Sequence, residues 1–327
     1  MSTSPAAARS HARSRPQSEP GPLVGLVRSA WSDLARRPTL LGFFAAVGLL
    51  VAMFGSNLAH MVFVWSSDEN YGHGFLVPLI ALYFANEATR GGEFAYRPGT
   101  GVGVILLFGA ILGRLATVVV PVGFVADLAM LAGLAGIVAI VFGGGALRRY
   151  GFAIGFLAFM VPLPIALYAR IASPLQLSVS SMAAWLLNVV GVPALCEGNM
   201  ITLPGDARLF VAEACSGMRQ LTGFLALTTA WAYLVRRPIW YRVTLVAGSV
   251  PIAMAANVSR VAITGWITYR LDARYASGSF HTIEGLLMIG LGLVLLRAMC
   301  WTLDRIPGVL PPRLTLGTTT DSAETLS

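Results

Sequence analysis

The segment Val122–Gly144 reads VGFVADLAMLAGLAGIVAIVFGG, and Asp127 is its one charged residue. About 20 apolar residues in a helix cross the hydrocarbon core of a bilayer, so this segment predicts a transmembrane helix. The segment before it, Gly101–Val120, reads GVGVILLFGAILGRLATVVV and is similarly apolar. Because glycines recur in both segments, we expect a helical hairpin that packs closely through small residues.

The same pattern extends over most of the chain. Hydrophobic residues make up 56% of its 327 residues and charged residues 12%, whereas a soluble domain carries about 25% charged residues. This composition excludes a soluble enzyme and predicts one polytopic membrane domain over 39–303. A disordered, arginine-rich cytoplasmic tail (1–38) without the features of a signal peptide should precede it, and a short cytoplasmic tail (304–327) should follow it.

We predict an all-α fold of about eight transmembrane helices. Pro162 and Pro164 should kink or end the fifth helix near the outer surface. The expected spans cover roughly 39–62, 75–88, 101–120, 122–144, 151–169, 217–234, 240–263 and 282–301.

The net charge of +8 indicates topology rather than nucleic-acid binding. All 23 basic residues are arginines, and many cluster between apolar spans, as in the cytoplasmic loops of membrane proteins. The pattern predicts a protein of the cytoplasmic (inner) membrane with both termini inside. The clusters are Arg36 with Arg37, Arg90 with Arg97, Arg148 with Arg149, and Arg236 with Arg237.

The segment between the fifth and sixth spans is predicted to lie outside the bilayer. Ser173–Val190 places most of its large apolar residues on one helical face, which predicts an extracytoplasmic interfacial helix. The runs 198–203 and 209–212 flank Pro204-Gly205-Asp206 and predict a short β-hairpin. The hairpin leads into Glu213-Ala214-Cys215-Ser216-Gly217-Met218-Arg219, at the outer start of the sixth span.

Cys215 lies where a loop becomes a helix, and the positive end of a helix favours a thiolate. Arg219 adds positive charge one turn later. A disulfide with Cys196, in the same extracytoplasmic segment, is the structural alternative, and position alone leaves both open. Cys300, near the inner surface, is interpreted as an apolar core residue.

Two further polar pairs lie at the same predicted membrane face. Asn257 and Arg260 share one helical face, and His281 and Glu284 are one turn apart at the start of the eighth span. In the structural alternatives, Arg260 only reaches toward the headgroups and His281 only caps its helix. Together, however, a thiol, an imidazole and a guanidinium are the groups that acyl transfer from a peptide carbonyl requires.

Four stretches, in order along the chain, carry a resemblance to a known family. They are Asn70-Tyr71-Gly72-His73-Gly74-Phe75-Leu76-Val77-Pro78, Ala214-Cys215-Ser216-Gly217-Met218-Arg219, Asn257-Val258-Ser259-Arg260, and His281 with Gly285. These stretches resemble the motifs of the exosortase/archaeosortase family of polytopic membrane transpeptidases. The resemblance extends from about Asn57 to Trp301.

The resemblance implies a cysteine peptidase or transpeptidase with Cys215 as nucleophile and Arg260 and His281 as its partners. The implied substrates are secreted proteins with a C-terminal PEP-CTERM-type signal, made of a short motif, a transmembrane segment and a basic tail. The cleaved protein would be anchored at the surface, through an unidentified acceptor, or serve exopolysaccharide production. Expected substrate-binding or supporting residues are Tyr71, His73, Glu213, Ser216, Arg219, Asn257 and Glu284, with a structural or positioning role favoured for His73.

A transporter or lipid-linked sugar carrier is the alternative function, in which Arg114, Asp127 and Glu284 would line a path through the bilayer. Arg114 and Asp127 could instead pair with each other. An envelope scaffold is a third hypothesis, and it predicts that Cys215 can be replaced without loss. No metal or other cofactor is expected, because the histidines lack ligand spacing and no phosphate-binding loop occurs.

Overall fold

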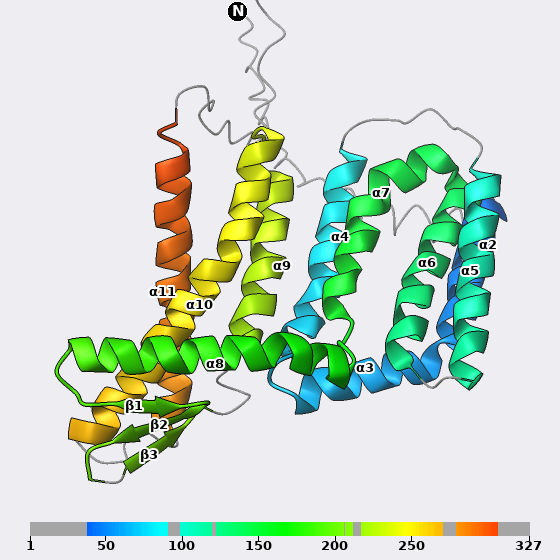
Figure 1. Cartoon of the computed structure of the whole chain (residues 1–327). Coiled ribbons are helices and arrows are strands. Elements are labelled where there is room, and N and C mark those ends of the chain that lie inside the picture. Colours follow the sequence, from blue (N-terminus) through cyan, green and yellow to red (C-terminus); the bar gives the residue numbers. More distant parts are fainter. Residues whose placement is uncertain are drawn as a thin grey trace, which may run out of the picture.

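The computed structural model describes residues 38–90, 99–119, 122–205, 207–211, 217–270 and 279–306, without the side chains of Pro38 and 279–284. Helices dominate, and a small three-stranded sheet lies at one end of the bundle (Figure 1). The predicted class, a helical polytopic membrane protein with a small β element, is confirmed at this level. Nearly all of the two predicted tails lies outside the described residues.

The helical hairpin predicted from the glycine-rich segments is present as α5 (Thr100–Val119) and α6 (Gly123–Phe142). The two backbones approach each other at Gly103 and Gly136. A Cβ atom on either glycine would lie 2.9 Å from the carbonyl oxygen of the other. Close packing through small residues is therefore confirmed.

The first predicted span is not one straight helix. α2 (Pro38–Met53) and α3 (Gly55–Ser67) are bent by 69° around Phe54, so the segment predicted as one span over 39–62 is a bent pair of helices. α2 is almost entirely apolar, whereas α3 carries several polar side chains, and Asn57 donates a 2.9 Å hydrogen bond to Asp127 of α6. Because polar groups are costly in hydrocarbon, α3 runs across the end of the bundle (Figure 1).

The predicted break at Pro162 and Pro164 is confirmed. α7 (Gly144–Phe156) continues as a 3-10 turn, η2 (Leu157–Met160), and ends before the two prolines. α8 (Ile165–Val189) then departs at 79° and lies across the ends of the upright helices (Figure 1). This is the orientation predicted for an interfacial helix, but α8 begins before Ser173 because Pro164, directly preceding it, has a φ compatible with a helix start.

The sheet packs against α8. β2 (Met200–Leu203) and β3 (Ala207–Phe210) form the predicted antiparallel hairpin. A further strand, β1 (Leu195–Glu197), pairs with the other edge of β2 and was not predicted, because three residues are too few for a recognisable pattern. Ile201 and Leu187 belong to the same buried apolar cluster, which fixes the sheet on α8.

Aromatic packing joins the two groups of upright helices seen in Figure 1. The ring of Tyr233 stacks on Phe152 with centroids 3.7 Å apart and meets Phe84 edge-on at 5.2 Å. These residues belong to α9, α7 and α4, respectively. The remaining helices are η1 (Gly72–Phe75), α4 (Leu76–Thr89), α9 (Met218–Leu234), α10 (Ile239–Arg270) and α11 (Ser279–Leu303).

Helix α10 extends past its predicted end to Arg270. Gly265 and Ile267 are still buried there, and a Cβ on Gly265 would lie 2.9 Å from Cδ1 of Leu187. Packing against α8 therefore explains why α10 continues to Arg270. The local sequence pattern gives no sign of this contact.

Among the described residues, four helices are long and apolar enough to cross a membrane, and six if each bent pair counts as one crossing. α4 and α9 have 14 and 17 residues, fewer than the about 20 expected of a span. The structure thus confirms a polytopic membrane protein, and the described part of the chain does not confirm the predicted number of eight spans.

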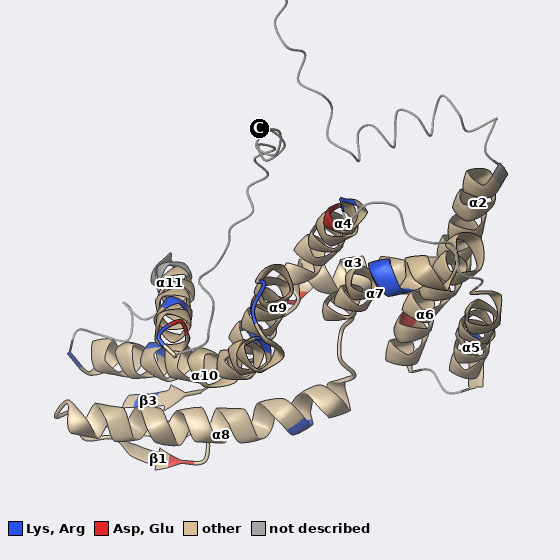
Figure 2. Cartoon of the chain, turned by 90° about the horizontal axis from the view of Figure 1, so that it is seen from above, with Lys and Arg blue, Asp and Glu red and all other residues tan. Residues whose placement is uncertain are grey.

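Charged residues are few in the described helices, which are largely coloured as uncharged (Figure 2). Arginines lie in or next to three helix ends: the end of α4, the start of α7 and the end of α9. These ends are on the opposite side of the bundle from α3, α8 and the sheet (Figure 1). Arg237, which follows α9, donates a 2.7 Å hydrogen bond to Asp304 beyond α11. The end with α8 and the sheet is the one that the sequence predicts to face outward.

Candidate functional site

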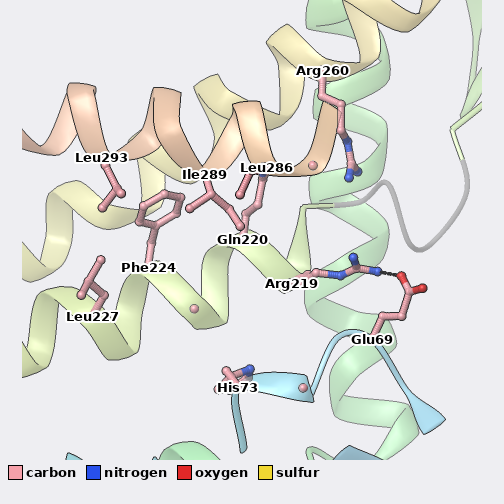
Figure 3. A pocket seen from close by; sticks show the side chains of 13 residues that line it. Glu69, His73, Arg219, Gln220, Phe224, Leu227, Arg260, Leu286, Ile289 and Leu293 are labelled. Carbon is pink, nitrogen blue, oxygen red and sulfur yellow. Dashed lines mark hydrogen bonds and ion pairs between the residues drawn. The ribbon is translucent and has the colours of Figure 1, made fainter. Parts of the chain in front are cut away.

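A cavity of about 730 Å³ lies between α9, α10, α11 and the turn that precedes α4 (Figure 3). Its polar lining comes from segments far apart in the chain. Glu69 and His73 precede α4, Arg219 and Gln220 begin α9, and Arg260 projects from α10. The rest of the lining is mostly apolar. It comprises Gly72 of η1 and, from α9 and α11, Gly223, Phe224, Leu227, Gly285, Leu286, Ile289 and Leu293.

Gly217 turns the chain into α9 with a left-handed backbone conformation, φ 88°. A Cβ here would lie 3.0 Å from Nδ2 of Asn257, which is fully buried in α10. Gly217 thus satisfies both a backbone and a packing requirement. Arg260 follows Asn257 by one helical turn and lines the cavity with 7% of its surface exposed. Of the two polar residues on this face of α10, Asn257 docks the start of α9 and Arg260 lines the cavity.

Arg219 forms an ion pair with Glu69 at the polar end of the cavity. Their side chains are 38% and 75% exposed, so solvent screens the pair. Figure 3 shows the guanidinium of Arg260 pointing toward the same region. The polar end thus contains two guanidinium groups, which can donate hydrogen bonds to an oxyanion.

The motif segment around His73 is fixed by the break between η2 and α8. The Tyr71 hydroxyl accepts a 3.1 Å hydrogen bond from the N–H of Leu163, and Nε2 of His73 lies 3.1 Å from the carbonyl oxygen of Phe159. Burial raises the pKa of Tyr71 and lowers the pKa of His73. The neutral imidazole is therefore favoured, with Nε2 as the donor to Phe159.

Gly74 in the same motif is required by packing. A Cβ at this position would lie 2.7 Å from Cε2 of Trp65, closer than an alanine tolerates. The indole Nε1 of Trp65 donates a buried 2.8 Å hydrogen bond to the carbonyl oxygen of Met160. The motif thus holds α3, η1 and η2 together and sets His73 in the wall of the cavity.

Residues 65–298 match the family model described as transmembrane exosortase (Exosortase_EpsH). The chain belongs to this family. The matched range contains all of the cavity-lining residues and the four motif segments. Neither a curated protein nor a solved structure matches the chain significantly.

Part of the site predicted for this exosortase lies outside the described residues. Glu213, Cys215 and Ser216 fall in the segment 212–216, before Gly217. His281 and Glu284 belong to α11, but their side chains are outside the described set. Their roles stay predictions. Gly285, one turn after His281, lines the cavity.

The described cysteines of the exosortase carry free thiols. Cys196 lies in β1 with its Sγ 3.4 Å from the carbonyl oxygen of Gly198. The alternative disulfide between Cys196 and Cys215 involves a residue outside the described ranges, so it stays a prediction. Cys300 is buried in an apolar cluster that joins α10 and α11, as predicted for a core residue.

Gln220 is a cavity residue that the sequence analysis missed. Its side chain lines the cavity with 9% of the residue exposed, and its Oε1 has no hydrogen-bond partner among the described residues. The signal was present, because a polar side chain within an apolar span is expensive and often functional. Glu69, which the sequence did not single out, pairs with Arg219.

Arg114 and Asp127 lie outside the cavity lining, and the hydrogen bonds of their side chains are to other residues. Arg114 Nε donates a 3.2 Å hydrogen bond to the carbonyl oxygen of Met53, and Asp127 accepts one from Asn57. Both residues thus stabilise the bend between α2 and α3. Among the described residues, no group of three or more metal-ligating side chains occurs.

Proposed function

We propose that the protein is a membrane-embedded cysteine peptidase or transpeptidase. It cleaves the C-terminal, PEP-CTERM-type signals of secreted proteins at the outer face of the cytoplasmic (inner) membrane, and both of its own termini lie inside. Membership of the transmembrane exosortase family supports this function. The position of the sheet and α8, opposite the arginine-rich helix ends, supports the proposed orientation.

The convergence of separate motif segments on one cavity carries the proposal. His73, Arg219 and Arg260 come from three such segments and line the same cavity. Cys215 precedes Gly217, at the start of α9, by two residues, and Gly285 follows His281 by one helical turn. The polar end of the cavity is therefore where we expect cleavage.

In the proposed reaction, the Cys215 thiolate attacks the carbonyl carbon of the scissile peptide bond. The resulting oxyanion is stabilised by oriented hydrogen bonds from the guanidinium of Arg260. The C–N bond then breaks, and His281 protonates the leaving amine, which leaves a thioester between the substrate and Cys215. An acceptor nucleophile or water attacks this thioester and releases Cys215 as a thiolate.

Other predicted residues support this centre. Asn257 holds the start of α9 through Gly217, and Tyr71 and His73 fix the turn before α4. Arg219 is oriented by Glu69 at the polar end of the cavity. Glu284 orients the imidazole of His281 in the proposed site, and Glu213 and Ser216 flank the nucleophile.

The decisive variant is Cys215→Ala, and Cys196→Ser is its matched control in the same predicted extracytoplasmic segment. A secreted reporter with a PEP-CTERM-type signal should be processed by the wild type and by Cys196→Ser. It should accumulate at full length with Cys215→Ala, although all three proteins are present in the membrane at equal levels. Wild-type processing by Cys215→Ala would overturn the proposed function.

A further inference from the structure

The apolar part of the cavity forms a groove between α9 and α11. Its walls are Gly223, Phe224 and Leu227 of α9 and Leu286, Ile289 and Leu293 of α11. The intervals of three and four residues place each set on one helical face. The groove is about two helical turns long, roughly 11 Å. α10 packs against both helices (Figure 2).

The groove is open along one side. Leu286 and Ile289 are 70% and 50% exposed although they line the cavity. At its base the helices touch, because Phe224 packs on Gly292, where a Cβ would overlap the phenyl ring. The groove is therefore closed at Phe224 and Gly292 and open along the side that Leu286 and Ile289 border.

Two glycines of the groove have no packing role within the described chain. A Cβ on Gly223 or Gly285 would meet no described atom within 4 Å, unlike one on Gly292. Glycine weakens a helix relative to alanine, so its use here calls for another reason. In membranes, small residues allow a second helix backbone to approach closely.

Gln220 lies where the polar lining passes into the groove (Figure 3). Its buried Oε1 has no hydrogen-bond partner among the described residues, and a buried carbonyl oxygen requires a donor. The first N–H groups of a helix have no acceptor within the helix, and they cannot stay unpaired in hydrocarbon. A helix that starts beside Gln220 would satisfy both requirements.

We propose that the groove binds the transmembrane helix of the substrate, and that Oε1 of Gln220 accepts a hydrogen bond from the first turn of that helix. The inference rests on the proposed function, because the peptide bond would be cleaved at the polar end of the same cavity. Docking at Gln220 fixes the helix start relative to Arg260. The number of residues between the cleaved bond and the helix start is then a determinant of specificity.

Photo-crosslinking tests the occupant of the groove in a Cys215→Ala protein, which keeps the signal uncleaved. The probe is a reporter whose PEP-CTERM-type signal the wild type is known to cleave. A crosslinking residue at Ile289 should capture the transmembrane segment of this reporter. The same residue at Val294, which is 65% exposed on α11 outside the cavity lining, should not. Capture from Val294 as strong as from Ile289 would overturn the proposal.

Leucine substitutions test the groove in the active protein. Gly223→Leu should block the groove and abolish reporter cleavage, while Cys215 stays alkylatable. Gly290→Leu is the matched control, since a Cβ on Gly290 also meets no described atom within 4 Å but the residue does not line the cavity. Full cleavage by Gly223→Leu would reject the groove and leave the nucleophile assignment intact. Cleavage by Cys215→Ala would instead reject the proposed function.

The hydrogen bond of Gln220 has a rescue test. Gln220→Leu should slow cleavage about tenfold, the effect of one lost hydrogen bond. A reporter with Asn at the start of its transmembrane helix supplies its own cap and should recover most of this loss. Full activity of Gln220→Leu, or a loss that the capped reporter does not reduce, would overturn the role of Gln220.

Discussion

Arg219 of α9 is ion-paired with Glu69, 150 residues earlier in the chain, in the turn before η1. The pair joins two motif segments at the polar end of the cavity. With side chains 38% and 75% exposed, it contributes about 0 to 1 kcal/mol to stability, because water screens such pairs. Its main effect is to orient Arg219 at the cavity, so loss of either charge should disturb function more than folding.

The first prediction separates these two effects. Glu69→Gln and Arg219→Gln should both leave the unfolding temperature in detergent nearly unchanged. Arg219→Gln should slow reporter cleavage strongly, because it removes a cation from the cavity, whereas Glu69→Gln keeps that cation and should slow cleavage less. Cleavage rates and melting curves of both variants check this. A large drop in melting temperature for either variant would show that the pair is structural.

The second prediction concerns Gly74 and Trp65. Gly74→Ala should destabilise the protein by about 1 to 3 kcal/mol, because the new Cβ overlaps a ring held by its hydrogen bond to Met160. Gly72→Ala is the control, since its Cβ would meet no described atom within 4 Å. Thermal unfolding of the two variants in detergent measures the difference. Equal melting temperatures would contradict the packing role of Gly74.

Local composition predicted most of the helices, and it failed where a contact distant in the chain decides the outcome. The segment 39–62 is apolar over most of its length, and its few polar residues, such as Asn57, did not by themselves predict the bend at Phe54. The bend depends on α3 bonding through Asn57 to Asp127, 70 residues away. In contrast, Pro162 and Pro164 act through their own backbone, and the break that they cause was predicted from the sequence.

The sequence predicted those parts of the candidate site that depend on a motif or on the depth of a residue in the membrane. Because the sequence places Arg219, Arg260 and His73 near one predicted membrane face, their convergence followed from the topology. The position of Cys196 in the short strand β1 and the position of Gln220 in the cavity wall both depend on how segments distant in the chain pack together. Neither property is encoded in a local pattern, so both required the three-dimensional structure.

The third prediction is a pH dependence of stability. Burial lowers the pKa of His73, against hydrogen bonds to the carbonyl groups of Phe159 and Asn70 that raise it. In the unfolded chain a histidine titrates near pH 6.5. The unfolded state therefore binds the proton more readily than the folded state does. The contribution of neutral His73 to folding stability is complete above about pH 6.5 and is lost as the pH falls through the folded pKa.

The measurement is the unfolding temperature in detergent between about pH 7.5 and pH 5. The wild type should lose stability toward the acidic end, and His73→Gln should lose less over the same interval, because glutamine does not titrate. If the unfolding temperature of His73→Gln falls as steeply as that of the wild type, groups other than His73 cause the loss of stability in acid.

The fourth prediction concerns Arg260, which is 7% exposed and lines the cavity. An arginine that only reaches toward the headgroups can be replaced by lysine at little cost. A guanidinium that donates oriented hydrogen bonds to an oxyanion cannot, because lysine lacks the planar fork. Arg260→Lys should therefore slow cleavage by about 10²- to 10³-fold, as expected when one oxyanion donor is lost.

His281→Gln provides the contrast that makes this result interpretable. Arg260→Lys keeps a positive charge near the nucleophile, so the rate and pH profile of Cys215 alkylation should change little. His281→Gln should slow alkylation itself, because the proposed imidazole partner no longer favours the thiolate. Slow cleavage with normal alkylation thus assigns Arg260 to the oxyanion, and slow cleavage with slow alkylation assigns it to activation of Cys215. Wild-type cleavage by Arg260→Lys would remove Arg260 from the reaction and leave it a structural role in the cavity wall.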